Sequence, residues 1–335
     1  MLAQLVVMLL VILVAAEVFT NALEHVGERL RISEGVTGSL FAAVGTAMPE
    51  SMVPLLAVFG MDGEIAVREE IGVGAILGAP LMLSTLSLSL MAFSVLKQRG
   101  LHGRLTPEKT GLMRDLNFFL LAFGIAAAAM FLPHKPHYWV SLHVLLGILL
   151  ILVYFIYVLL TLRVSSQLVR DGHHTEAHSE LFLCRLYLPD HWIVIFLQLI
   201  LGLGLLIAGA EGFIHNVETI SREFGVSALL LSLLIIPIAT ELPEKVNSIL
   251  WIRRRKDTLA FGNITGAMVF QGTILPAMGI LLTPWDLRQE VLMGVIVSYL
   301  AALWLRWMMK SGHLKVWHLG VNGTLYIVYL MLVLV

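Results

Sequence analysis

The chain has 335 residues, of which 58% are hydrophobic and 13% are charged, and its mean hydropathy is +0.88. A soluble domain of this size needs more polar surface, so the composition excludes a soluble protein and predicts an all-α polytopic membrane protein. A formal net charge of −1 argues against a nucleic-acid partner, and Cys184, the only cysteine, excludes a disulfide within the chain.

Ten apolar stretches follow one another along the chain, and most reach the roughly 20 residues that a helix needs to cross a bilayer. The first stretch lacks a basic front end, so we expect a retained helix there rather than a cleaved signal peptide. The predicted transmembrane helices are 2–23, 34–60, 70–96, 116–133, 138–162, 191–213, 226–252, 259–283, 289–309 and 315–335.

Lys and Arg are distributed unevenly over the loops between these stretches. The loops and helix ends on one side carry seventeen of them, whereas the other side has four, namely Arg68, Lys135, Arg222 and Arg288. Basic residues favour the cytoplasmic side. We therefore expect both termini on the non-cytoplasmic side of a cell (inner) membrane.

Two of the apolar stretches contain the same costly feature, a glutamate directly after a proline. Residues 46–50 read Thr-Ala-Met-Pro-Glu, and residues 240–244 read Thr-Glu-Leu-Pro-Glu. A carboxylate inside an apolar span is a functional candidate by default, because its transfer into the bilayer is unfavourable. The duplication predicts two transport elements that meet around one cation.

The two halves of the chain align without a gap at an offset of 194 residues, for about seventy residues. An odd number of five helices in each half would reverse the second half in the membrane, which is the inverted-repeat architecture of secondary transporters. We expect a first repeat at 1–162, a cytoplasmic linker at 163–190 and a second repeat at 191–335. The identical pairs include Ala16/Ala210, Glu17/Glu211, Glu24/Glu218, Ser33/Ser227, Thr46/Thr240, Pro49/Pro243, Glu50/Glu244, Ala66/Ala260, Gly72/Gly266 and Gly78/Gly272.

The repeated segments resemble the alpha-repeats of the calcium/cation antiporter superfamily, which includes sodium/calcium exchangers. The resemblance covers about half of the chain, at 16–81 and 210–280, and is most specific at the Pro-Glu segments 45–50 and 239–244. It implies an antiporter of ten helices in which the two Pro-Glu segments form a cation site near the middle of the membrane.

The residue types in these segments suit calcium, which takes six to eight oxygen ligands that usually include carboxylates. The Thr and Glu of each motif are four residues apart and share one helix face. A proline inside a helix also frees the carbonyl four residues earlier. The alternatives are isolated protonated acids and threonines that bond only to their own helix. The predicted ligands are Glu50, Glu244, Thr46, Thr240, Gly45 and Ala239.

Two further polar residues distinguish the second repeat. Glu241 and Gln271 stand where the first repeat has Ala47 and Leu77, and we expect both to join the site. The resemblance implies that sodium binds to hydroxyl and amide oxygens, and those oxygens are missing here. In addition, the carboxylates of Glu50, Glu241 and Glu244 would be clustered, and three clustered carboxylates cannot all stay ionised without a cation. Both points favour proton over sodium coupling. Pairing of Glu241 with Lys245 is the alternative interpretation.

The leading hypothesis is a secondary active cation antiporter that exports Ca²⁺ in exchange for H⁺ or Na⁺. The alternatives are transport of Mn²⁺, Mg²⁺ or a monovalent cation by the same fold, or a non-transporting membrane protein. No enzyme motif is present in the sequence, and we expect no cofactor. The expected partners are small inorganic cations and the lipid bilayer, and the sequence leaves the oligomeric state open. His173, His174 and His178 have metal-like spacing, but an exposed polar linker is the favoured interpretation.

Overall fold

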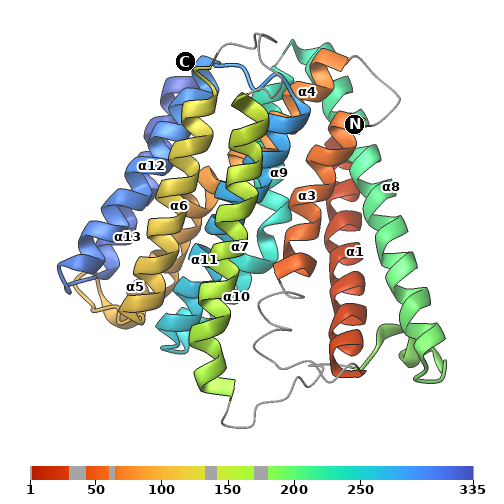
Figure 1. Cartoon of the computed structure of the whole chain (residues 1–335), viewed down its shortest axis with the longest axis horizontal. Coiled ribbons are helices and arrows are strands. Elements are labelled where there is room, and N and C mark those ends of the chain that lie inside the picture. The colour runs from red at the N-terminus through yellow and green to blue at the C-terminus, as the bar shows by residue number, and fades with distance from the viewer. Residues whose placement is uncertain are drawn as a thin grey trace.

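The computed structural model describes residues 2–29, 43–59, 65–132, 142–169, 180–225 and 227–334. In these ranges the chain is helical apart from its connecting loops and one isolated β-bridge between Arg104 and Lys315. The elements shown in Figure 1 are α1 (Leu2–Arg29), α3 (Ala43–Phe59), α4 (Ile65–Met82), the π-helix η2 (Leu83–Ser87), α5 (Leu88–Arg99), α6 (Lys109–Ala129), α7 (Leu142–Val169), the 3₁₀-helix η3 (Phe182–Leu186), α8 (Trp192–Phe224), α9 (Ala228–Thr240), α10 (Leu242–Arg253), α11 (Asp257–Leu282), α12 (Gln289–Lys310) and α13 (Val316–Leu334).

These helices fall on the predicted apolar stretches. In the described ranges, seven helical segments are long and apolar enough to cross a membrane, and the longest, Ile65–Arg99, runs through α4, η2 and α5 without a break. Shorter apolar helices lie in α1, α3 and α9. The expected all-helical, membrane-spanning architecture is therefore present.

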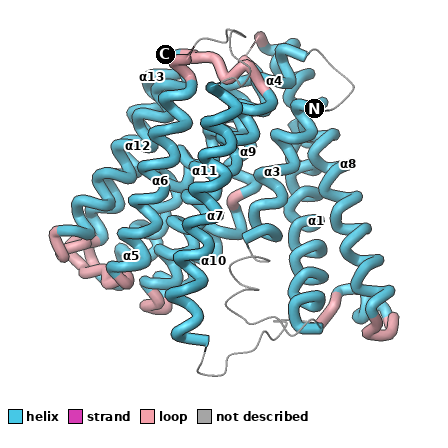
Figure 2. Tube along the Cα trace, viewed as in Figure 1, coloured by secondary structure: helices cyan, strands magenta, loops and turns pink. Residues whose placement is uncertain are grey.

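The stretch 226–252 differs from the expected single span. Its helix α9 ends at Thr240, the chain turns at Glu241, and α10 begins at Leu242. Pro243 consequently lies in the first turn of α10, where a proline without an N–H is well tolerated, and not in a helix interior. The break between α9 and α10 lies in the middle of the bundle, whereas most loops lie at its two ends (Figure 2).

The helices are arranged as two outer groups around a central one (Figure 1). Helices α1 and α8 lie side by side at one edge, and α12 and α13 pack together at the other. Between them, α4 packs against α9 and α11. The marked N- and C-terminal ends lie at the same end of the bundle, and the turns after α5, α10 and α12 lie at the opposite end.

Glycines allow α4 to approach α9 closely. A Cβ atom added to Gly78 would lie 2.2 Å from the carbonyl oxygen of Leu233, and one added to Gly74 would lie 2.7 Å from that of Leu229. Small residues are the usual means of bringing helix backbones together in a membrane, where helix association depends on packing. This contact holds α9, and the break that follows it, against the first half of the chain.

Ion pairing ties together the loops at the end opposite the termini. Both guanidinium ends of Arg99 bond the Asp257 carboxylate, at 2.8 and 2.9 Å, and both side chains are buried. The backbone N–H of Thr106 adds a 2.8 Å bond to the same carboxylate. Since Arg104 and Lys315 also form a β-bridge, the loops after α5, α10 and α12 make one connected layer.

Side chains donate hydrogen bonds to backbone carbonyls in and around the π-helix η2. A π turn replaces the usual bonds to the carbonyl four residues back. The Ser84 hydroxyl donates to the carbonyl of Pro80 at 2.7 Å, and the Thr85 hydroxyl donates to that of Leu81. From α13, the amide of Asn322 donates to the carbonyls of Ser84 at 2.8 Å and Ala301 at 3.1 Å. Asn322 thereby links η2 to α12 and α13.

Candidate cation site

Three of the predicted acidic residues are buried together at the break between α9 and α10. Glu50 on α3 and Glu244 on α10 are each 4% exposed, and Glu241, in the turn, is 0% exposed. The charge of Glu50 interacts with the charges of both Glu244 and Glu241. Helix α3 packs against α9, so the structure brings the two Pro-Glu segments to one place.

The side chain of Lys245 enters the same place and pairs with Glu241. Its Nζ lies 3.6 Å from Glu241 Oε2 and donates a 2.9 Å hydrogen bond to the carbonyl oxygen of Pro237. Lys245 is only 5% exposed, and it also interacts electrostatically with Glu244 and Glu50. Of the two interpretations of Glu241, the structure supports the ion pair with Lys245.

Gln271 approaches Glu241 from α11. Its Nε2 donates to Glu241 Oε1 at 3.1 Å, and its side chain is 3% exposed. A carboxylate can only accept when ionised, so the amide nitrogen is the group that faces Glu241. Glu241 thus has the Gln271 amide on one oxygen and the Lys245 ammonium 3.6 Å from the other.

The hydroxyl of Thr240 shows the ordinary helical bond that was the alternative to a ligand role. It donates to the carbonyl of Ile236 at 3.1 Å, and Thr240 is 1% exposed. Its lone pairs stay available because the hydroxyl uses only its proton. Gly45 and Thr46 belong to α3 and Ala239 to α9, but their surroundings lie outside the described part of the structure.

Asn263 is a polar contact that the sequence reasoning missed. From α11, its Nδ2 donates to the carbonyl oxygen of Glu244 and to the hydroxyl of Ser248, at 3.0 Å each. These bonds fix the start of α10 on α11. Its signal in the sequence is a polar residue between Gly262 and Gly266 in a largely apolar stretch.

Some buried oxygens at the site lack a hydrogen-bond donor within the described residues. They include Glu50 Oε2 and Gln271 Oε1. Buried carboxylates need a compensating partner. In the same ranges, no three His, Cys, Asp or Glu side chains converge into a preformed metal cage. The described residues thus bury carboxylate oxygens at this break without forming a closed metal cage.

A second buried polar cluster lies on α6, away from the glutamates. Asp115 accepts a 2.8 Å bond from the Thr265 hydroxyl and a 3.1 Å bond from the Tyr157 hydroxyl, and Arg114 lies 3.7 Å away. These partners satisfy both carboxylate oxygens, which indicates a structural role.

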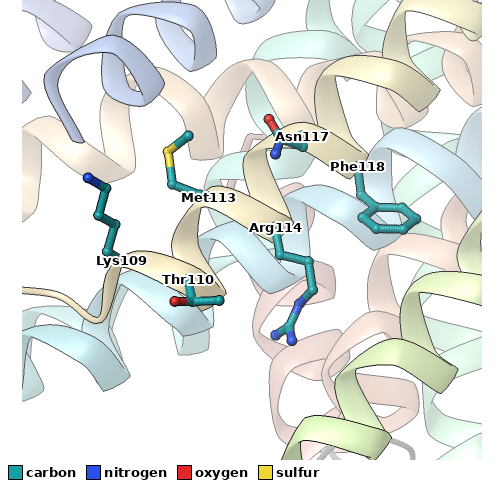
Figure 3. Close-up of a pocket in the computed structure, with 6 residues that line it drawn as sticks. All are labelled: Lys109, Thr110, Met113, Arg114, Asn117 and Phe118. Carbon is teal, nitrogen blue, oxygen red and sulfur yellow. The ribbon is translucent and has the colours of Figure 1, made fainter. Parts of the chain in front are cut away.

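A surface hollow of about 440 Å³ lies beside this cluster (Figure 3). It shares no lining residue with the glutamate site, and its lining comes from the first turns of α6, with Lys109, Thr110, Met113, Arg114, Asn117 and Phe118.

Sequence comparison finds relatives that cover most of the chain. CaxA of Alkalimonas amylolytica is 27% identical over 288 residues, which cover 82% of this chain and 79% of CaxA. The inner membrane protein YrbG of Escherichia coli is 26% identical over 288 residues, covering 85% and 81% of the two chains. Sodium/calcium exchanger MaX1 of Methanosarcina acetivorans is 29% identical over 110 residues, or 32% of this chain and 31% of MaX1.

Solved structures show the same fold. The H⁺/Ca²⁺ exchanger CAX superposes with a TM-score of 0.69 at 18% identity, covering 98% of this chain and 81% of that one. The sodium-calcium exchanger NCX_Mj superposes with a TM-score of 0.58 at 20% identity, covering 99% of both chains.

A protein-family model also matches most of this chain. The chain is a multi-pass integral membrane protein, and its residues 1–163 and 194–335 match the model of the family described as sodium/calcium exchanger protein. These two segments contain both Pro-Glu motifs and all of the glutamates that meet at the break between α9 and α10. The chain belongs to the sodium/calcium exchanger protein family.

Proposed function

We propose that this protein is a secondary active antiporter that exports Ca²⁺ from the cytoplasm in exchange for H⁺ or Na⁺. The observation that carries the proposal is the burial of Glu50 and Glu244, one from each half of the chain, at a place where their charges interact. Buried ionisable groups in a membrane protein mark ion pathways. Structural neighbours named as H⁺/Ca²⁺ and sodium-calcium exchangers agree with this choice of cargo.

In the proposed site, Glu50 and Glu244 supply the carboxylate ligands. The hydroxyl lone pairs of Thr240 and Thr46 and the carbonyls of Gly45 and Ala239 complete much of an oxygen shell of the kind that calcium prefers. Competition between calcium and the coupling ion for the same two carboxylates enforces exchange. Removal of either carboxylate therefore stops transport instead of slowing it modestly.

The proposed architecture is that of ten transmembrane helices in two inverted five-helix repeats, 1–162 and 191–335, joined by a cytoplasmic linker at 163–190. Inverted repeats expose a site at their interface alternately to the two sides of the membrane. The packing of α1 on α8, which are counterparts at the 194-residue offset, supports this arrangement.

The proposed orientation has both termini outside the cytoplasm, in a cell (inner) membrane. The two termini lie at one end of the bundle, and the arginine-rich turn after α10 lies at the other (Figure 1). The inner-membrane relative YrbG supports the choice of membrane. With Cys184 replaced by serine, labelling of one cysteine added at the C-terminus with a membrane-impermeant reagent tests it, and protection of that cysteine in intact cells would contradict it.

Pairing of Glu241 with Lys245 changes the argument about the coupling ion. The third carboxylate was one of two reasons to favour protons, and an ammonium beside it removes that reason. The other reason, the hydroxyl and amide oxygens that are missing at the sodium-binding positions of the resembled family, is unchanged. Both H⁺ and Na⁺ therefore stay in the proposal. Calcium flux in proteoliposomes, driven in one arm by a sodium gradient and in the other by a pH gradient, decides between them.

The same assay tests the site. We expect Glu50→Ala and Glu244→Ala, alone or together, to abolish gradient-driven calcium uptake while the purified protein stays monodisperse. The matched control is Glu211→Gln, which removes an exposed carboxylate from α8 and should leave uptake unchanged. Uptake that survives the double substitution would contradict the proposal.

A different cargo in the same site is the second candidate. The site offers only oxygen ligands, which suit manganese and magnesium as well as calcium. Competition by a series of cations against calcium uptake distinguishes them. If another divalent or a monovalent cation is carried and calcium does not compete, the cargo is that cation; retained binding without any flux would instead identify a non-transporting protein.

A further inference from the structure

A buried lysine inside a cation site is the least expected feature of this chain. Lys245 is 5% exposed, and its ammonium lies between the Glu241 carboxylate and the carbonyl of Pro237 at the end of α9. Transfer of an ammonium into a membrane interior is costly, so its position needs a compensating gain. Position 51, which matches position 245 at the 194-residue offset, holds a serine, so the lysine is confined to one half of the chain.

The ligands of the ammonium are those that a small cation would take. A carboxylate oxygen and a backbone carbonyl at the end of a broken helix form a common cation site in transporters. The other Glu241 oxygen accepts a 3.1 Å hydrogen bond from the Gln271 amide on α11. Glu241 is thereby fixed as a partner for Lys245.

The net charge of the proposed site follows from the formal charges of its four ionisable side chains. When all four groups are ionised, the carboxylates of Glu50, Glu241 and Glu244 contribute three negative charges and Lys245 contributes one positive charge. The ionised site carries a net charge of minus two. One divalent cation neutralises it, and so do two monovalent cations.

We propose that Lys245 is a resident cation of the site, whose ammonium permanently occupies the place beside Glu241 and sets the exchange at two monovalent cations per divalent cation. This inference rests on the proposed antiport function. Glu241 is then a counter-ion and not a ligand of the transported cation. Exchange is electroneutral, because equal charge crosses the membrane in the two directions.

Three variants test the charge sum without changing the shape of the site greatly. Glu241→Gln leaves a net charge of minus one, Lys245→Gln leaves minus three, and the double variant returns to minus two. If the charge sum governs the site, each single variant changes cation handling and the double variant restores it. If Lys245 only anchors the broken helix, the double variant stays as defective as the worse single one.

The measurements are calcium binding to the purified protein by calorimetry, and calcium flux in proteoliposomes with the membrane potential clamped by potassium and valinomycin. Wild-type flux is expected to be independent of the clamped potential. Glu241→Gln should weaken calcium binding at least about tenfold. Lys245→Gln should add one monovalent cation to each transport cycle, so calcium flux should rise more steeply with the concentration of the coupling ion. The double variant should return to within about threefold of wild type in both calcium binding and calcium flux.

The outcomes separate the two proposals. Wild-type calcium flux that responds to the clamped potential, or a double variant no better than the singles while all variants stay monodisperse, would overturn the resident-cation role and leave the antiporter intact. Wild-type protein that binds calcium without flux would overturn the antiporter, and the binding series alone would then judge the charge sum. Protein that binds none of a series of divalent cations would overturn both.

Discussion

The amide nitrogen of Gln271 lies 3.1 Å from a carboxylate oxygen of Glu241 and so connects α11 to the turn between α9 and α10. Both side chains are buried, and each is a main polar contact of the other. A buried polar group that loses its partner retains its full desolvation cost. This bond therefore stabilises the helix break on which the candidate site depends.

We expect Gln271→Leu to lower the unfolding free energy by roughly 1–3 kcal/mol, the cost of an unpartnered buried acceptor. The measurement is the midpoint of thermal unfolding in detergent. Gln98→Leu, at an exposed position of α5, is the control and should change the midpoint little. Equal midpoints for the two variants would show that Gln271 does not support Glu241.

The Arg99–Asp257 pair should be the most sensitive contact at the loop end of the bundle. Removing one member of a buried ion pair typically costs about 3–5 kcal/mol, because the other charge stays buried without compensation. We expect Arg99→Met to lose that amount of stability in a chemical unfolding experiment. Arg253→Met removes an exposed charge from the neighbouring α10 and should be nearly neutral; a similar loss in both variants would contradict a special role for the pair.

Close packing of α4 on α9 predicts intolerance to a side chain at Gly78. A Cβ there would lie 2.2 Å from a backbone oxygen, which cannot move aside as a side chain can. We expect Gly78→Ala to lower the melting temperature and to reduce cation flux, since α9 carries the helix break. Gly262→Ala, also in a helix but with nothing within 4 Å, should be neutral or stabilising by up to about 1 kcal/mol.

Asn322 should be required for the π-helix η2. We expect Asn322→Leu to cost about 1–3 kcal/mol by leaving the carbonyls of Ser84 and Ala301 without its amide. Hydrogen exchange of residues 83–87 should rise specifically, because those bonds hold the irregular turn. Thr324→Val, two residues along α13 and exposed, is the control, and unchanged exchange in Asn322→Leu would show that η2 does not need it.

Glu108 makes a pH-dependent contribution at the start of α6. Partial burial opposes ionisation, but bonds from the backbone N–H groups of Gly111 and Thr110, at 2.5 and 2.6 Å, outweigh it and lower the pKa of Glu108 below the ordinary 4.5. A lowered folded-state pKa gives stability that is present above 4.5 and is lost as pH falls through the folded value. The melting difference between wild type and Glu108→Gln should therefore shrink on acidification from pH 6 to pH 3, and a difference that grows would contradict this sign.

The sequence predicted the pair of buried glutamates better than the contacts around them. Glu50 and Glu244 could be found because a carboxylate in an apolar span is costly and because the motif is repeated. The break at Glu241 could not be predicted, since a proline at 243 fits either a kinked helix or the start of a new one. The pairing of Glu241 depended on whether Lys245 turned inward, and helix periodicity alone left both choices open.

Other contacts depend on tertiary structure and have no local signal. Asn322 bonds Ser84 across 238 positions, and Asp115 bonds Thr265 across 150. Each of these residues is an unremarkable polar position within an apolar helix. Only the packing of distant helices determines which carbonyl or hydroxyl such a residue meets.

The π-helix η2 limits how much of one half of the chain could be exchanged for the other half. A π turn holds about one residue more than an α turn, and each residue advances the helix by about 100°. Side chains in α5, beyond Ser87, therefore point about 100° away from the directions they would have if the helix continued without the π turn. Helix α11 has no such interruption. The ungapped correspondence ends close to this turn. A chimera that exchanged the two halves upstream of residue 83 would keep its inward and outward faces, whereas one that extended past residue 87 would turn lipid-facing side chains into the bundle.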